Sequence, residues 1–269
     1  MFGKHTVLCL EIGLLTAWLS IISLILQHHH GHLLRAPMEV VTEWLVPPSP
    51  LPSSYNALDS VGLCMAKDVI FDQQGCGACL AFSVATAYGL RACLRGGEAF
   101  AKHVPSPFRL YDCAGGDCAT DRGLNEVGAM RVMSQRGVPP LLDSPTVFGQ
   151  GCPTEKDNTT HWLRVQRYRH VCGAQPIKRE LMQGGPAVFA MSVSEEALQS
   201  DEKIVKGQLE HGSIAALTYH SLVVLGWNDQ DSTWAVQNSW SHQWGVHGRG
   251  TVPRSFFDCV LVFEPALFT

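Results

Sequence analysis

The sequence predicts an α+β fold with two lobes, the first rich in helices and the second rich in strands. Residues 79–94 are mostly helix-compatible and follow a glycine-rich turn. After about residue 160, apolar stretches such as 188–193 and 219–227 have the length and composition of strands. Helices and strands that segregate in this way typically form an α+β arrangement. We therefore expect a functional cleft between the two lobes.

Local signals set the limits of the expected elements. The helix over 79–94 is expected to close before Gly96 and Gly97, and a helix over 125–136 before Gly137, since glycine is common just past a helix C-terminus. Alternating hydrophobicity predicts a strand over 163–171, near the start of the second lobe. The further expected elements are a short helix over 176–183 and a strand over 234–240.

Composition favours a folded protein of the secretory pathway. The chain of 269 residues is 46% apolar and 16% charged, with a formal net charge of −4 and ten cysteines. No basic run is present, so nucleic acid is not an expected partner. Ten cysteines in one chain suggest an oxidising compartment.

The N-terminus supports this assignment. Lys4 precedes Thr6–Leu26, a stretch of 21 residues in which only Glu11 is charged. We expect residues 1–27 to be a secretory signal peptide or a membrane-spanning signal anchor, and the sequence leaves both open. Either one leaves the rest of the chain luminal or extracellular, in a lysosome-like or vacuolar compartment or outside the cell.

A short linker or pro-segment is expected over residues 28–50, followed by one folded domain over 51–269 with lobes 51–160 and 161–269. Four histidines lie within His28–His32, but no complete ligand set is evident beside them, so we interpret the tract as solvated. No metal or organic cofactor is expected. Asn158 begins an Asn-Thr-Thr glycosylation sequon.

Cys79 is the candidate nucleophile. It begins the expected helix, where the positive end of the helix dipole favours the thiolate form. The small residues Gly77 and Ala78 let a substrate come close to it. Such a thiolate needs a base, and His220 and Asn238 lie on two apolar segments, 141 and 159 residues further along the chain.

These residues resemble the motifs of the papain-like cysteine peptidases, closest to the cathepsin B-like enzymes, over about residues 51–269. The resemblance implies a Cys-His-Asn endopeptidase that forms an acyl-enzyme, with a helical lobe and a β-barrel-like lobe on either side of the cleft. Cys79 would be the nucleophile, paired as a thiolate with protonated His220, and Asn238 would orient the imidazole. Gln73 would be the side-chain oxyanion donor, with Gln74 as a rival for that role.

The resemblance also implies substrate-binding residues. Trp240 would shield the His220–Asn238 hydrogen bond and wall the primed side of the cleft. Gly123 is what remains of a glycine motif that binds the substrate chain. Glu264, near the C-terminus, would lie in a pocket that admits basic side chains. The sequence lacks the paired histidines of the cathepsin B occluding loop, which favours endopeptidase over exopeptidase action.

Six of the cysteines are assigned to disulfides by the resemblance, and two more are expected as buried free thiols. The implied pairs are Cys64–Cys93, Cys76–Cys118 and Cys113–Cys152. The expected free thiols are Cys172 and Cys259.

Two other functions stay open. Leu80 stands where the family usually has Trp or Tyr, which together with the altered glycine motif suggests a peptide-binding domain that does not cleave. The Cys76–Cys79 spacing is also that of a C-x-x-C redox site. For the peptidase, the expected partners are peptide or protein substrates, and the membrane if the N-terminal segment stays uncleaved. A monomer is expected.

Overall fold

The structure is a computed structural model that describes residues 49–120, 123–154, 162–194 and 217–267. The chain divides into two units, Met1–Pro50 and Leu51–Thr269, and every described helix and strand belongs to the second. The expected signal segment over 1–27, most of the linker and the Asn158 sequon lie outside the described residues. Within the described part, no helix combines the length and the apolar content needed to cross a bilayer.

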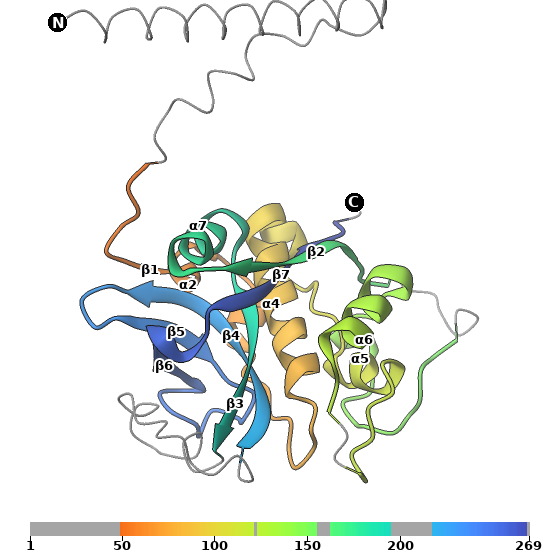
Figure 1. Cartoon of the computed structure of the whole chain (residues 1–269). Coiled ribbons are helices and arrows are strands. Elements are labelled where there is room, and N and C mark those ends of the chain that lie inside the picture. Colours follow the sequence, from red (N-terminus) through yellow and green to blue (C-terminus); the bar gives the residue numbers. More distant parts are fainter. Residues whose placement is uncertain (1–48, 121–122, 155–161, 195–216, 268–269) are drawn as a thin grey trace, which may run out of the picture. The chain divides into compact units, whose positions relative to one another are not determined.

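Helix α4 (Cys79–Gly96) is the centre of the domain. Every residue from Leu80 to Cys93 is buried, so the helix has no solvent-exposed face along this stretch. Figure 1 shows α4 between the sheet and helices α5 (Pro107–Cys113) and α6 (Glu126–Arg131). Small residues allow this close packing, since a Cβ atom at Gly89 would approach the Ala66 side chain to 2.6 Å.

Capping residues define the other helices. The side chain of Ser106 accepts from the backbone N–H of Arg109 to begin α5, and Asn125 accepts from Gly128 at 2.7 Å to begin α6. One π-helical turn continues α6 to Arg136, before Gly137. The other helical elements are α2 (Ala57–Ser60), α3 (Met65–Asp68), η2 (Gly97–Phe100), η3 (Val132–Arg136), η4 (Leu141–Asp143), α7 (Ala174–Gly184) and η7 (Arg254–Phe256).

A single antiparallel sheet forms the second half of the domain. Its path runs β2-β7-β3-β4-β5-β6, and β1 pairs with β4 off this path. The described strands form an open sheet, so the expectation of a β-barrel-like lobe is corrected to an open sheet in a mixed α+β fold. The strands are β1 (Ser54–Asn56), β2 (Val165–Cys172), β3 (Ala187–Ser194), β4 (Leu217–Asn228), β5 (Thr233–Gln237), β6 (Arg249–Pro253) and β7 (Cys259–Pro265).

Strand β4 separates the two hydrophobic cores of the domain. Val223 and Leu225 belong to the core that surrounds α4, whereas Leu222 and Val224 belong to the core on the other face of the sheet. This alternation follows from the two-residue period of a strand. Because both faces are buried, the register of β4 is firmly set, and with it the position of His220 on the same strand.

Four disulfides cross-link the domain. The three expected pairs, Cys64–Cys93, Cys76–Cys118 and Cys113–Cys152, are present. The expectation of free thiols at Cys172 and Cys259 is wrong, because β2 and β7 pair antiparallel with these two residues opposite each other, and they form the fourth disulfide. Among the described cysteines, Cys79 alone is free.

Candidate active site

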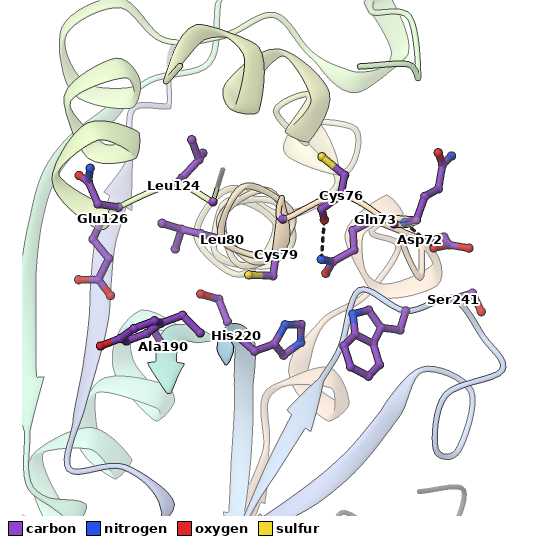
Figure 2. A pocket seen from close by; sticks show the side chains of 18 of the residues that line it. Asp72, Gln73, Cys76, Cys79, Leu80, Leu124, Glu126, Ala190, His220 and Ser241 are labelled. Atoms are coloured by element: carbon purple, nitrogen blue, oxygen red, sulfur yellow. Dashed lines mark hydrogen bonds between the residues drawn. The ribbon is translucent and has the colours of Figure 1, made fainter. Parts of the chain in front are cut away.

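An open cleft of about 1090 Å³ runs across the N-terminus of α4. Its walls come from the turn before α4, the segment 123–126, the strands β3 and β4, and the loop after β5. Figure 2 shows Leu124, Leu80 and Glu126 on one side of Cys79, and Gln73 and Asp72 on the other. The cleft therefore has two distinguishable ends on either side of the free cysteine.

Cys79 is the first residue of α4, and its side chain lines the cleft. Within the described residues, no side chain caps this helix, so the N–H groups of its first turn and the positive end of its dipole are directed at the site. One turn later, the Ser83 hydroxyl donates to the carbonyl of Ser221 at 3.0 Å. This bond fixes α4 to the segment of β4 that carries His220.

His220 and Asn238 form a buried hydrogen bond. His220 Nε2 lies 2.8 Å from Asn238 Oδ1, and each residue is only 3% exposed. The same Asn238 oxygen accepts from the backbone N–H of Ser239 at 2.8 Å, which fixes the amide orientation and identifies Nε2 as the donor. Nδ1 is then the imidazole nitrogen left to exchange a proton within the cleft, and Figure 2 shows the His220 ring on the side of the cleft toward which Cys79 points.

Gln73 is held at both ends of its side-chain amide. Its Nε2 donates to the carbonyl of Cys76 at 2.9 Å, and its Oε1 accepts from the Ser239 hydroxyl at 2.6 Å. A side-chain amide nitrogen carries two hydrogens, so one N–H is left for a ligand. Gln74 differs, because it is exposed and adopts a positive φ of 55°, with its backbone N–H bonded to Asp72.

The loop after β5 holds this turn in place. An isolated antiparallel bridge joins Asp72 to Trp240, and Gln73 N donates to Ser239 O at 2.8 Å. The Trp240 ring lies against His220 with centroids 4.9 Å apart. The apolar ring covers one face of the imidazole and limits the access of water to its bond with Asn238.

Burial dominates the protonation of the two reactive groups. It raises the pKa of the Cys79 thiol, against hydrogen bonds from Ser221 and from α4 that lower it. It lowers the pKa of His220 to about 4, against the Asn238 hydrogen bond that raises it. The neutral thiol and imidazole are thus favoured by burial, whereas the helix dipole and mutual attraction favour the ion pair. The expectation from the sequence is a thiolate paired with protonated His220, and burial works against both of these charged forms.

The predicted substrate-binding residues do not all lie in the cleft. Gly123 and Trp240 line it. Glu264 does not, because β7 pairs with β2 and sets Glu264 opposite Arg167, whose guanidinium donates to both carboxylate oxygens at 2.9 Å. Sequence reasoning placed Glu264 in a substrate pocket, and the structure corrects this.

Several residues of the site were not anticipated from the sequence. Ser239 fixes Gln73, Ser83 fixes the position of β4, and Glu126 is a carboxylate within the cleft. An available signal was the Asn125 cap, which implies that Glu126 lies in the first turn of a helix beside Gly123. Among the described residues, no group of three or more His, Cys, Asp or Glu side chains could hold a metal ion.

Comparison with known proteins agrees with this geometry. Residues 52–261 match the sequence profile of the papain family cysteine proteases. The chain belongs to the papain family. Its cysteine peptidase activity follows from this membership. Cys76 is bonded to Cys118 while Cys79 is free, so these two cysteines do not form the bridge of a C-x-x-C redox site in this structure.

Several curated relatives of this papain-family chain are named cathepsin B-like. It is 27% identical over 252 residues to "Cathepsin B-like cysteine proteinase 5" of Caenorhabditis elegans, covering 78% of this chain and 72% of the relative. It is 25% identical over 223 residues to "Cathepsin B-like CP3" of Giardia intestinalis, covering 77% and 71%.

Solved structures share the fold of this family member. Procathepsin B S9 of Trypanosoma congolense superposes with a TM-score of 0.67 at 21% identity, covering 87% of this chain and 82% of that one. Xylellain, a cysteine protease of Xylella fastidiosa, superposes with a TM-score of 0.63 at 18% identity, covering 81% and 88%.

Proposed function

We propose that this papain-family chain is an endopeptidase that cleaves peptide bonds through Cys79, His220 and Asn238. The observation that carries the proposal is the buried His220–Asn238 hydrogen bond of 2.8 Å in the same cleft as the only free cysteine of the described residues. A nucleophile, a base and a group that orients the base are the three parts that covalent acyl transfer requires.

The first chemical step is a proton transfer followed by attack. His220 accepts the Cys79 thiol proton at Nδ1, because Nε2 is bonded to Asn238. The sulfur then forms a bond to the substrate carbonyl carbon, and the carbonyl oxygen becomes an oxyanion. The remaining N–H of Gln73 and the backbone N–H of Cys79 are the donors for that oxyanion.

Collapse of this intermediate breaks the peptide C–N bond. The proton held by His220 passes to the leaving amine, and the acyl group stays on Cys79 as a thioester. Water then attacks the thioester carbonyl carbon while His220 removes a proton from that water. The carboxylic acid product leaves, and Cys79 regains its proton.

Endopeptidase action is favoured by the composition of the cleft walls. Among the described residues that line the cleft, His220 is the only histidine. An exopeptidase that removes C-terminal dipeptides needs a cation to bind the terminal carboxylate, and the described lining contains no lysine or arginine either. A substrate chain is therefore expected to extend beyond both ends of the cleft.

A second candidate is a papain-family domain that binds peptides without cleaving them. Two observations favour it: burial stabilises the neutral forms of Cys79 and His220, and Leu80 lies at the cleft where the family usually has an aromatic residue. This candidate uses the same cleft and differs only in turnover.

One experiment separates the two candidates. The purified protein is treated with an epoxide or vinyl-sulfone probe, the modified residue is mapped by mass spectrometry, and hydrolysis of internally quenched peptides is compared between wild type and Cys79→Ala. We expect labelling at Cys79, internal cleavage by wild type and none by Cys79→Ala. Equal, near-zero hydrolysis by both proteins supports the binding domain, and release of C-terminal dipeptides alone overturns the endopeptidase assignment.

We also propose that the protein works in an oxidising compartment, luminal or extracellular. Four disulfides in the domain support this proposal, since cytosolic thiols are kept reduced. Trapping free thiols in living cells before lysis tests it. We expect one reactive cysteine in the domain, and a fully reduced domain contradicts the assignment.

A further inference from the structure

One end of the cleft carries a carboxylate that the mechanism does not use. Glu126, in the first turn of α6, lines the cleft and is partly exposed. His170 Nε2 contacts its Oε2 atom at 2.7 Å. A carboxylate offers about four lone-pair positions, so this contact holds the group in place and leaves acceptor capacity for a ligand.

Apolar side chains lead from Cys79 toward this carboxylate. Leu80 is 3% exposed, Leu124 is partly buried, and both line the cleft. Figure 2 shows Leu80 and Leu124 on the same side of Cys79 as Glu126. An aliphatic wall that ends in an anion is complementary to the lysine or arginine side chain, which has an apolar stem and a cationic head. Leucine at position 80 makes both of these side chains aliphatic, and the exposed Tyr219 also lines the cleft.

The direction of the chemistry assigns this end to the acyl part of the substrate. His220 delivers a proton to the leaving amine, and Trp240 packs against His220. The leaving part of the substrate therefore lies on the Trp240 side. The residues that precede the scissile bond extend the other way, past Gly123 toward Glu126.

We propose that Glu126 selects substrates with a lysine or arginine within the three residues that precede the scissile bond. This inference rests on the proposed peptidase function. The charge of the cleft supports this proposal. The described lining residues include two carboxylates, Asp72 and Glu126, and no lysine or arginine. Asp72 is at the opposite end and accepts the backbone N–H of Gln74 at 2.7 Å.

The test compares arginine with citrulline, its neutral isostere, at each of the three positions of a fluorogenic peptide. Wild type, Glu126→Gln and Glu264→Gln are assayed for kcat/KM. Glu264→Gln is the matched control, since that carboxylate is paired with Arg167 outside the cleft lining. We expect wild type and the control to prefer arginine at one position, and Glu126→Gln to lose about 10- to 100-fold of that preference, as for a charged hydrogen bond.

The outcomes distinguish this inference from the proposed function. Wild-type cleavage without an arginine preference, or a preference unchanged in Glu126→Gln, overturns the role of Glu126 while the peptidase stands. Probe labelling of Cys79 and turnover of the citrulline peptides report on folding of the variant. If wild type does not cleave, the Kd values of the arginine and citrulline peptides are measured on Cys79→Ala with and without Glu126→Gln. A charge preference that disappears with Glu126→Gln supports the inference, and equal Kd values overturn it.

Discussion

At the scale of single residues, the site depends on side chains that are held from two directions. Gln73 is bonded at both ends of its amide by Cys76 and Ser239, and Asn238 receives two donors on one oxygen. Each orientation is therefore fixed before a substrate arrives. Preorganised donors need no rearrangement when charge develops on the substrate, and this is the source of their catalytic effect.

The two adjacent glutamines give a direct test of the oxyanion donor. Gln73→Ala removes the buried amide, and we expect kcat to fall by about 10²- to 10³-fold. Gln74→Ala is the matched control, because Gln74 is exposed and already has a positive φ, and we expect about a threefold change or less. Steady-state kinetics on one fluorogenic peptide measures both. A larger loss in Gln74→Ala would assign the role to Gln74.

His220 links the stability of the site to pH. Burial lowers its pKa to about 4 in the folded protein, whereas an unfolded chain titrates near 6.5. Between these values the unfolded state binds more protons, so the free energy of unfolding rises with pH. We expect this contribution to be present above pH 6.5 and lost as the pH falls toward 4.

Urea unfolding of wild type and His220→Gln between pH 4 and 7.5 measures this effect. The difference in unfolding free energy between the two proteins is expected to shrink or reverse in favour of the variant as the pH falls. Parallel pH profiles would show that His220 is not held in the neutral form.

At the scale of elements, local sequence signals were sufficient for several helices and strands, including α4, the longest described helix. The helix predicted over 79–94 is α4, and the expected helix over 125–136 is α6 with its π-helical extension. The strands predicted over 163–171 and 188–193 correspond to β2 and β3. These segments carry their own glycine stops, Asn cap or hydrophobic period, so they could be predicted without knowledge of their partners.

Features that depend on distant pairing could not be predicted. Neither β6 nor β7 was assigned, and the partners of Cys259 and Glu264 on β2 lie 87 and 97 residues earlier in the sequence. The burial of Arg91 could not be predicted either, since it depends on two distant acceptors, the carboxylate of Glu180 and the carbonyl of Gly185. The Cys79, His220 and Asn238 motifs were recognisable because each is short and local. Glu126 was not, because its place in the cleft depends on how α6 packs.

Strand β4 requires a glycine where β1 pairs with it. A Cβ atom at Gly226 would collide with the backbone carbonyl of Tyr55, which β1 contributes to the pair. We expect Gly226→Ala to lower the free energy of unfolding by about 1–3 kcal/mol through overpacking. The control is Gly62→Ala, where the added Cβ meets nothing within 4 Å. Thermal unfolding of both variants is the measurement, and equal Tm values would contradict the close approach of β1 to Gly226.

At the scale of the whole molecule, disulfides join segments that are far apart in the sequence. Cys76–Cys118 cross-links the turn before Cys79, which lines the cleft, to the chain that follows α5. Cys172–Cys259 joins β2 to β7 across 87 residues of chain. A cross-link that closes a long loop restricts the unfolded chain and thereby stabilises the fold.

The two disulfides are expected to differ in their effects on the protein. Replacing Cys172 and Cys259 by serine should reduce the free energy of unfolding by about 2–5 kcal/mol and leave probe labelling of Cys79 unchanged. Replacing Cys76 and Cys118 should give a similar loss of stability and also slow the labelling of Cys79. Urea unfolding and labelling rates measure the two effects. Equal labelling rates in both variants would show that the turn before Cys79 keeps its geometry without the Cys76–Cys118 bond.

The pairing of β1 with β4 also has a consequence for how far the domain can be shortened from its N-terminal side. Pro52 accepts from the Trp227 indole, and Ser53 accepts from the backbone N–H of Asp229, just before Ser54–Asn56 join the strand that carries His220. From Pro52 onward the chain is therefore held to β4 and to the turn that follows it. Removal of residues 52–56 would delete β1 and leave Gly226, Trp227 and Asn228 of β4 without their partners on that side.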